Sequence, residues 1–189
     1  MTGKPIDRKT WIALVVSLVS LFAGIALFQL SDSQLKQPDI QSIQSSVPKP
    51  DTLQSLEAIP LIGLKGESRK LGDWKQPVLV INFWAPWCVP CRREVPDLIS
   101  LQNEFNGQLQ VLGLAYDSVE NIESFAAEYQ MNYPSFVANQ HIQMYSAVFK
   151  NKSGALPFTA IIDRERKIVF THTGIISLQA LRQQVSKLL

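Results

Sequence analysis

Cysteine is scarce in this chain of 189 residues, which contains only Cys88 and Cys91. One pair is too few for a fold built on disulfides, and its close spacing instead indicates redox or metal chemistry. Histidine is equally scarce, because only His141 and His172 are present, both far from the pair in sequence. A structural zinc needs four ligands, so we interpret these histidines as ordinary surface or sheet residues and expect neither metal nor cofactor.

An excess of one charge is also missing. The formal net charge is +2, and no basic stripe with interleaved aromatic residues appears, so a nucleic-acid partner is not expected. The hydrophobic content of 46% suits a folded domain but is unevenly distributed. No internal repeat is visible. The length allows one domain of ordinary size plus additional segments.

Charged residues are absent from residues 11–30, which form one continuous apolar run. Twenty helical residues span about 30 Å, the thickness of the hydrocarbon core of a bilayer. Basic residues in segment 1–10 precede this run, which predicts a cytoplasmic N-terminus. We therefore expect a single-pass anchor in the bacterial inner membrane, with the rest of the chain on the periplasmic or extracytoplasmic side.

A cleaved signal peptide is the alternative for this run. The apolar stretch is longer than the core of a typical signal peptide, and Ala26-Leu27-Phe28 lacks the small last residue of a cleavage site. No cysteine follows Leu21-Phe22-Ala23-Gly24, which excludes lipoprotein processing. We favour an uncleaved anchor, and in either case the cysteine pair is exported.

Residues 31–58 have the composition of a flexible linker. Half of them are Ser, Gln or Pro, and neither a helical nor a strand period is sustained. Such a segment cannot bury enough apolar surface to become ordered. As a coil it would reach on the order of 30 Å, enough for a tethered domain to move over neighbouring membrane proteins.

Residues 59–189 carry the pattern of a globular domain. The sequence predicts a hairpin from residues 60–64 and 68–71, then strands over 78–84, 109–116, 158–163 and 168–173. It predicts helices after Cys88, after Ser118, over 142–149 and after Ser177, with a kink at Pro96 in the first of them. This order is typical of an α/β domain with a mixed central sheet and helices on both faces.

The two cysteines lie where the strand over 78–84 gives way to a helix. Cys88 falls at the helix N-terminus, where the partial positive charge and free N–H groups favour a thiolate. Arg92 and Arg93 add positive charge one turn further on. We therefore expect Cys88 to attack a substrate disulfide and the deeper Cys91 to resolve the mixed disulfide. Trp87 and Pro86 would cover the pair and offer an apolar platform for a substrate chain.

The stretch Phe83-Trp84-Ala85-Pro86-Trp87-Cys88-Val89-Pro90-Cys91 resembles the active site of the thioredoxin superfamily. The predicted anchor, the Arg92-Arg93-Glu94 continuation and the spacing to Pro157 resemble the TlpA/ResA-like thiol–disulfide oxidoreductases of bacterial cell envelopes. The resemblance implies a thioredoxin fold with a central βα insertion. It also implies a cis Pro157 facing the disulfide, with Leu156 presenting its backbone to a substrate peptide.

Glu94 lies where ResA-like proteins keep an acid near the cysteines. It could exchange a proton with Cys91 and raise the pKa values of the thiols. The alternative is a first-turn glutamate that the helix dipole favours. Thioredoxins proper carry a buried aspartate six residues before the first cysteine, whereas this chain has Asn82. Because Asn82 cannot titrate, Glu94 is the acid to test.

Several functions compete at this point. Copper handling would use two cysteines and a distant histidine, but such proteins resemble Cys-x-x-x-Cys, and Val89-Pro90 supplies no ligand. A peroxidase would need a Thr-x-x-Cys environment, and a binding module would not need two reactive thiols. We predict an exported thiol–disulfide oxidoreductase, acting as a reductase, with copper handling or cytochrome c maturation as the alternative. The resemblance implies oxidised or reduced envelope proteins as substrates and a membrane thiol-electron transporter as partner.

Overall fold

The computed structural model describes residues 56–189. The predicted anchor and all but the last three residues of the predicted linker lie outside this range. The described elements, in chain order, are β1 (Pro60–Ile62), β2 (Ser68–Lys70), η1 (Leu71–Asp73), β3 (Val78–Trp84), α4 (Val89–Glu104), β4 (Leu109–Ala115), α5 (Val119–Glu128), β5 (Ser135–Val137), η2 (Asn139–His141), α6 (Ile142–Val148), β6 (Phe158–Ile162), β7 (Ile168–Thr173) and α7 (Leu178–Val185). No helix within residues 56–189 is long and apolar enough to cross a membrane.

The central sheet has five strands in the order β5-β4-β3-β6-β7. Strands β3, β4 and β5 are parallel, whereas β6 is antiparallel to β3 and β7 is antiparallel to β6. β1 and β2 form the separate antiparallel hairpin that the sequence predicted. The mixed sheet is therefore confirmed, with β3 at its centre. All seven residues of β3 are buried, as its continuous apolar run indicated.

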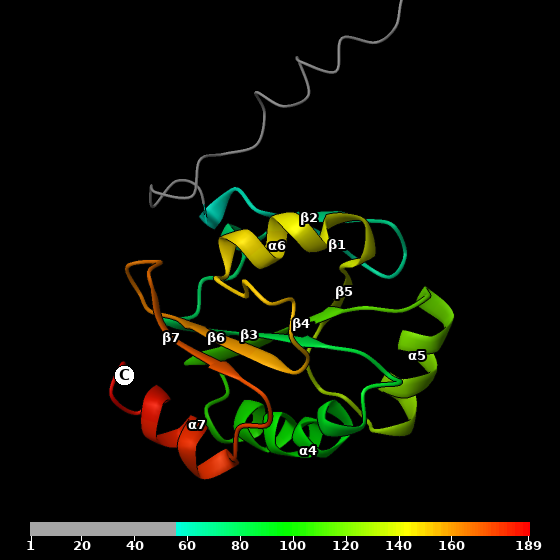
Figure 1. The fold of residues 1–189 in the computed structure, drawn as a ribbon. Helices are drawn as coiled ribbons and strands as arrows, with labels where there is room; N and C mark the ends of the chain where they lie inside the picture. Colours follow the sequence, from blue (N-terminus) through cyan, green and yellow to red (C-terminus); the bar gives the residue numbers. More distant parts are fainter. Residues whose placement is uncertain (1–55) are drawn as a thin grey trace, which may run out of the picture. The chain divides into compact units, whose positions relative to one another are not determined.

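Helices cover both faces of this sheet (Figure 1). α4 and α7 pack on one face, where Leu98, Leu101, Leu181 and Val185 contact the apolar residues of β3 and β4. The hairpin and α6 lie on the other face. There Tyr145 donates a hydrogen bond of 2.7 Å from its hydroxyl to the carbonyl of Pro60. α5 lies beside α4 and packs Phe125 against Trp84 at the end of β3.

Local sequence signals account for the starts of α5 and α7. Ser118 and Ser177 are the N-caps of α5 and α7, as predicted, and each side chain accepts a hydrogen bond from a backbone N–H three residues on. α4 is continuous through Pro96. The short strand β5 was not predicted, because three residues are too few to show a strand period.

Candidate active site

The two cysteines form a disulfide at the start of α4. Cys88 is the N-cap residue of this helix, and its sulfur accepts a hydrogen bond of 3.3 Å from the backbone N–H of Cys91. Pro90 occupies the first turn, where its missing N–H costs no hydrogen bond. Both residues are buried, but Cys88 is 5% exposed and Cys91 only 1%. The sulfur that a partner can reach first is therefore that of Cys88.

Trp87 is the most exposed large hydrophobic residue of the described chain, with 65% of its surface accessible. Its indole N–H nevertheless donates to the carbonyl of Tyr116, which follows β4, at 3.2 Å. Val89, on the other side of Cys88, is also exposed. The disulfide is thus flanked by two exposed apolar side chains. The sequence analysis expected Trp87 together with Pro86, which is half-buried, and did not expect Val89.

The segment before β6 contains Leu156 and Pro157, the two residues that the family resemblance places opposite the disulfide. The Leu156–Pro157 peptide bond is cis, as the family resemblance implied. Leu156 packs against the hydrophobic cluster that includes both cysteines. Asn151, which is buried, fixes this segment because its side chain both donates to the carbonyl of Ala155 and accepts from its N–H. The sequence analysis missed Asn151, although the Asn-Lys-Ser-Gly run around it is a turn signal.

Glu94 lies on α4, three residues after Cys91, and only 1% of its surface is exposed. It does not belong to the first turn of the helix, which contains no acidic residue, so the helix-dipole alternative does not describe it. Burial raises the pKa of Glu94 from 4.5 to about 8, partly offset by the hydrogen bond from Thr159 and reinforced by the charge of Asp97. At neutral pH this side chain is therefore mainly a carboxylic acid.

Two neutral side chains of the sheet hold one oxygen of Glu94. Its Oε1 accepts from the side-chain amide of Asn82 at 3.3 Å and from the hydroxyl of Thr159 at 3.1 Å. Asn82 also donates to the Thr159 hydroxyl oxygen at 3.3 Å. The other oxygen, Oε2, has no hydrogen-bond partner within residues 56–189. One oxygen is thus fixed, and the other is left to exchange a proton.

Sequence reasoning did not identify Thr159. A signal was present, because Thr159 is the one hydroxyl residue of the otherwise apolar β6 and lies two residues after Pro157. Its pairing with Asn82 across two strands could not be read from the sequence, since it depends on the antiparallel register of β3 and β6.

Arg92 lies between the turn before Cys88 and α5. Its Nη1 donates to the carbonyl of Pro86 at 3.4 Å. Its guanidinium lies 5.5 Å from the ring centre of Phe125 on α5 and 5.4 Å from that of Tyr129, the C-cap residue of that helix. It also approaches Glu128 at 3.7 Å. Arg92 therefore ties α4 to α5.

Metal ligands do not gather in the part of the chain that the structure describes. No group of three or more His, Cys, Asp or Glu side chains is placed to hold an ion among residues 56–189. His172 is a sheet histidine of β7, and its Nε2 lies 3.1 Å from the carbonyl oxygen of Ile175.

Comparisons with known proteins show which family the chain belongs to. Residues 52–171 match the AhpC/TSA family. The chain is 30% identical to the thioredoxin-like protein YneN of Bacillus subtilis, over 94% of this chain and 97% of that protein. It is 28% identical to the thiol–disulfide oxidoreductase ResA of Geobacillus thermodenitrificans, over 68% of this chain and 72% of ResA.

Solved structures show the same fold. A thioredoxin-related protein from Neisseria meningitidis serogroup B superimposes with a TM-score of 0.61 at 28% identity, over 67% of this chain and 96% of that one. A DsbF homologue from Corynebacterium diphtheriae gives a TM-score of 0.63 at 23% identity, over 70% and 85% of the two chains, which bears on the fold alone. The expected resemblance to ResA-like proteins and the thioredoxin-like fold are thereby confirmed. The chain belongs to the AhpC/TSA family and, with its bonded Cys88–Cys91 pair, is a thiol–disulfide oxidoreductase.

Proposed function

We propose that this protein is an exported, membrane-tethered reductase that passes electrons from its Cys88–Cys91 dithiol to oxidised proteins of the bacterial envelope. The observation that carries the direction of electron flow is the burial of Glu94, three residues after Cys91 on the same helix. A strong oxidant owes its potential to a stabilised thiolate in its reduced form. A buried acid works against that thiolate, because its carboxylate repels the sulfur and its neutral form adds no positive charge.

The roles follow from exposure and position. Cys88, the more accessible sulfur, attacks the substrate disulfide, and Cys91 then attacks Cys88 to release the reduced substrate. Glu94 exchanges the proton of Cys91. Trp87 supplies the apolar platform, and the Leu156–Pro157 segment presents its backbone to the substrate chain. No cofactor takes part in this scheme.

The location and the partners belong to the same proposal. The uncharged run over 11–30 and the basic residues before it support an inner-membrane anchor with the domain outside the cytoplasm. A reductant in an oxidising compartment needs a source of electrons, and a membrane thiol-electron transporter meets that need. Envelope proteins with a reducible cysteine pair, apocytochrome c among them, are the expected clients.

Equilibration of the domain with thiol–disulfide redox buffers tests the direction. We expect a reduction potential near the roughly −270 mV of thioredoxin. A value near the roughly −120 mV of the strong periplasmic oxidant DsbA would reverse the proposed electron flow.

Cys88→Ser should abolish reduction of a protein disulfide, and retention of full activity would reject the assignment of Cys88. Protease accessibility of the domain in spheroplasts tests its export separately.

A further inference from the structure

The loop between α6 and β6 buries one polar side chain. Asn151 is only 1% exposed, although its neighbours Lys150 and Lys152 are both exposed. Burying an amide is costly unless it is hydrogen-bonded, so this position needs a reason. The side chain crosses the loop to Ala155. Its nitrogen donates to the Ala155 carbonyl at 3.1 Å, and its oxygen accepts from the Ala155 N–H at 3.0 Å. Asn151 therefore occupies both polar groups of the Ala155 backbone.

The backbone of the loop is shaped for this contact. Lys150 follows the C-cap residue of α6 and has a left-handed φ of 64°, which is a common way for a helix to end. Gly154 also has a left-handed φ, of 62°, which glycine adopts without steric cost. Its N–H donates to the carbonyl of Asn151 at 3.0 Å and closes a turn. This turn brings Ala155 back to the side chain of Asn151.

Leu156, the next residue, keeps its backbone groups free. Neither its N–H nor its C=O forms a hydrogen bond in the part of the chain that the structure describes. The groups on both sides are occupied, because Asn151 holds Ala155 and the carbonyl of Pro157 accepts from the N–H of Gly174 at 2.9 Å. A following proline also favours an extended backbone at Leu156. One donor and one acceptor are thus available between two fixed points.

These free groups lie at the end of the sheet from which the cysteine turn departs. Phe158, the first residue of β6, pairs with Phe83 near the end of β3. Cys88 follows only four residues after Trp84, the last residue of β3. An extended backbone with free polar groups can pair with a partner chain, and such main-chain hydrogen bonds supply affinity. A substrate chain that reaches Cys88 comes to this end of the sheet.

We propose that Asn151 is a positioning residue for substrate binding, which holds Leu156 so that its free N–H and C=O pair with the main chain of a protein substrate. This inference rests on the proposed function, which gives the Leu156–Pro157 segment its role, and adds the residue that orders the segment. Without Asn151, the backbone before Leu156 would become ordered only when substrate binds. Ordering one residue lowers affinity by roughly tenfold. A small disulfide without a peptide backbone should not depend on Asn151.

Steady-state kinetics of the full-length protein with two disulfides tests this proposal. Asn151→Ala should raise the KM for a disulfide-bonded peptide roughly tenfold and leave kcat and the rate with a small aromatic disulfide unchanged. Asn151→Asp fills the same volume and keeps only the acceptor for the Ala155 N–H, so it should change the KM in the same direction. An unchanged KM in both variants rejects the proposal. Equal losses with the peptide and the small disulfide also reject it, because they would assign Asn151 to the architecture of the site.

Modified peptides test the main-chain pairing from the substrate side. A single N-methyl group, moved in turn along the residues beside the reactive cysteine, removes one backbone donor at a time. At one position it should raise the KM of the unmodified protein roughly tenfold, since a hydrogen bond to the Leu156 carbonyl is lost. The same peptide should lose little more with Asn151→Ala, because the two changes affect one interaction. A scan without effect, or losses that simply add, would overturn the proposal.

Two control variants separate positioning from general stability. Ser153→Ala changes an exposed residue of the same loop. Asn132→Ala removes another asparagine whose amide donates to a backbone carbonyl, that of Ile99 in the second half of α4. Both should leave the KM for the peptide unchanged. Amide hydrogen exchange gives a readout independent of activity, since the Ala155 N–H should lose protection in Asn151→Ala and keep it in both controls.

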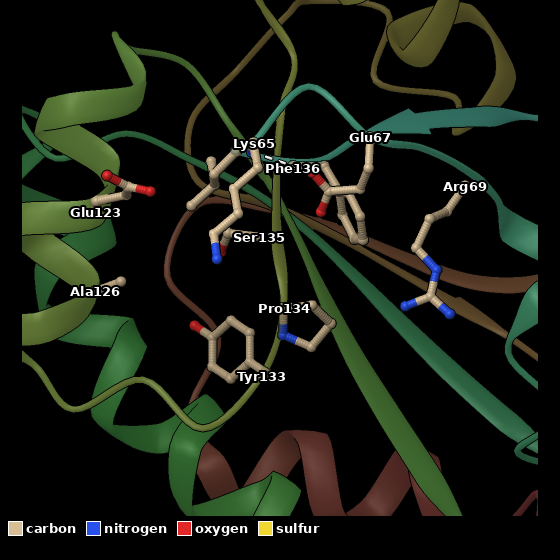
Figure 2. Close-up of a pocket in the computed structure, with 10 residues that line it drawn as sticks. Lys65, Glu67, Arg69, Glu123, Ala126, Tyr133, Pro134, Ser135 and Phe136 are labelled. Atoms are coloured by element: carbon tan, nitrogen blue, oxygen red, sulfur yellow. Dashed lines mark hydrogen bonds between the residues drawn. The ribbon is translucent and has the colours of Figure 1, made fainter.

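A pocket at the β5 edge of the sheet is the alternative place for a substrate chain. It measures roughly 370 Å³, and Figure 2 shows Lys65, Glu123 and Tyr133 around it. Strands β4 and β3 separate β5 from β6. Lys65→Ala and Glu123→Gln should therefore leave the KM for the peptide unchanged. A rise in KM in these variants, with none in Asn151→Ala, would place the substrate at the pocket and overturn the proposal.

Failure of the proposed function has a different signature. If the unmodified protein oxidises the reduced peptide but does not reduce its disulfide, the reductase direction is rejected. The Asn151 variants are then compared in the oxidation reaction, because both directions pass through the same mixed disulfide. An unchanged KM for Asn151→Ala in the active direction rejects the role of Asn151 and leaves the proposed function intact.

Discussion

The two faces of β3 differ in what they bury. Toward the hairpin and α6, Phe83 packs edge-to-face on Phe149 and Phe158 at ring-centre distances of 5.8 and 5.5 Å, in a mainly aromatic layer. Toward α4, the next residue back along the strand is Asn82, which is bonded to Glu94 and Thr159. Both faces are equally inaccessible to water.

This contrast separates stability from chemistry within one strand. An apolar aromatic layer gains free energy from every buried ring. A buried acid with one unpaired oxygen loses free energy, because its ionised form is poorly solvated. Burying Glu94 on the α4 face therefore costs free energy of folding, and the aromatic packing on the opposite face offsets this cost. Substitutions on the two faces should accordingly change different measurements.

The largest effect on stability is expected from Phe83→Ala. Removal of a buried phenylalanine destabilises a core by about 3–5 kcal/mol, because a cavity is left among its neighbours. Urea unfolding measures this change in the free energy of unfolding, and an insulin-reduction assay on the folded fraction should show little change in activity. A large loss of activity per folded molecule would mean that the aromatic layer shapes the active site.

Glu94→Gln should raise the free energy of unfolding, whereas Phe83→Ala lowers it. The size of this increase should depend on pH. The folded pKa of Glu94, about 8, exceeds its ordinary value of 4.5, so the unfolded chain releases this proton first as pH rises. The native domain therefore loses stability between about pH 4.5 and 8 and none further above that range. Glu94→Gln removes this loss, so it should stabilise the domain by up to about 5 kcal/mol at pH 9 and hardly at all at pH 4.

Unfolding titrations at the two pH values measure this difference, with Glu104→Gln on the exposed C-terminal end of α4 as a matched control. Activity should fall in the same Glu94→Gln variant, by roughly 10²-fold or more if the acid transfers the Cys91 proton. The pH dependence of thiol alkylation should also lose its step near pH 8. A stabilised variant with full activity and an unchanged profile would leave Glu94 without a chemical role.

Thr159→Val should have a smaller effect on stability, of about 1 kcal/mol, since one buried hydrogen bond is lost while the volume is kept. The Thr159 hydroxyl lowers the pKa of Glu94, so its removal should move the alkylation midpoint above the value of about 8. The pH profile measures that shift. A midpoint that moves downward would show that Asn82, rather than Thr159, controls the carboxyl group.

Trp87→Ala should have the smallest effect on stability, within about 0.5 kcal/mol, because the side chain is mostly in water. The substitution is expected to weaken the binding of protein substrates. The KM for a protein disulfide should rise, since the apolar platform beside Cys88 is lost, whereas the rate with a small aromatic disulfide should change little. Steady-state kinetics with both substrates measures this, and equal losses for both would assign Trp87 to the chemistry of the cysteines.

The fold was largely predictable because its strongest signals are local. The run Val78–Trp84, the caps Ser118 and Ser177 and the hairpin turn near Gly66 act through neighbouring residues. β5 escaped prediction because its three residues are held by pairing with β4 and not by their own pattern. Asn151 was missed for a similar reason, since its hydrogen bonds become visible only when the turn before Leu156 is formed.

The candidate site likewise contains features that local sequence predicts and features that depend on the tertiary structure. The order of a buried strand, a tight turn and a helix start placed Cys88 at the helix N-cap, because backbone geometry over a few residues decides it. The hydrogen bonds that Asn82 and Thr159 donate to Glu94 depend on the register of β3 and β6, which brings together two residues 77 positions apart. Registers follow from the packing of whole faces, and no local segment contains that information. The chain alone thus identified the cysteines, their chemistry and Glu94 as the acid to test, and only the assembled sheet decided that Glu94 is buried and which side chains hold its carboxyl group.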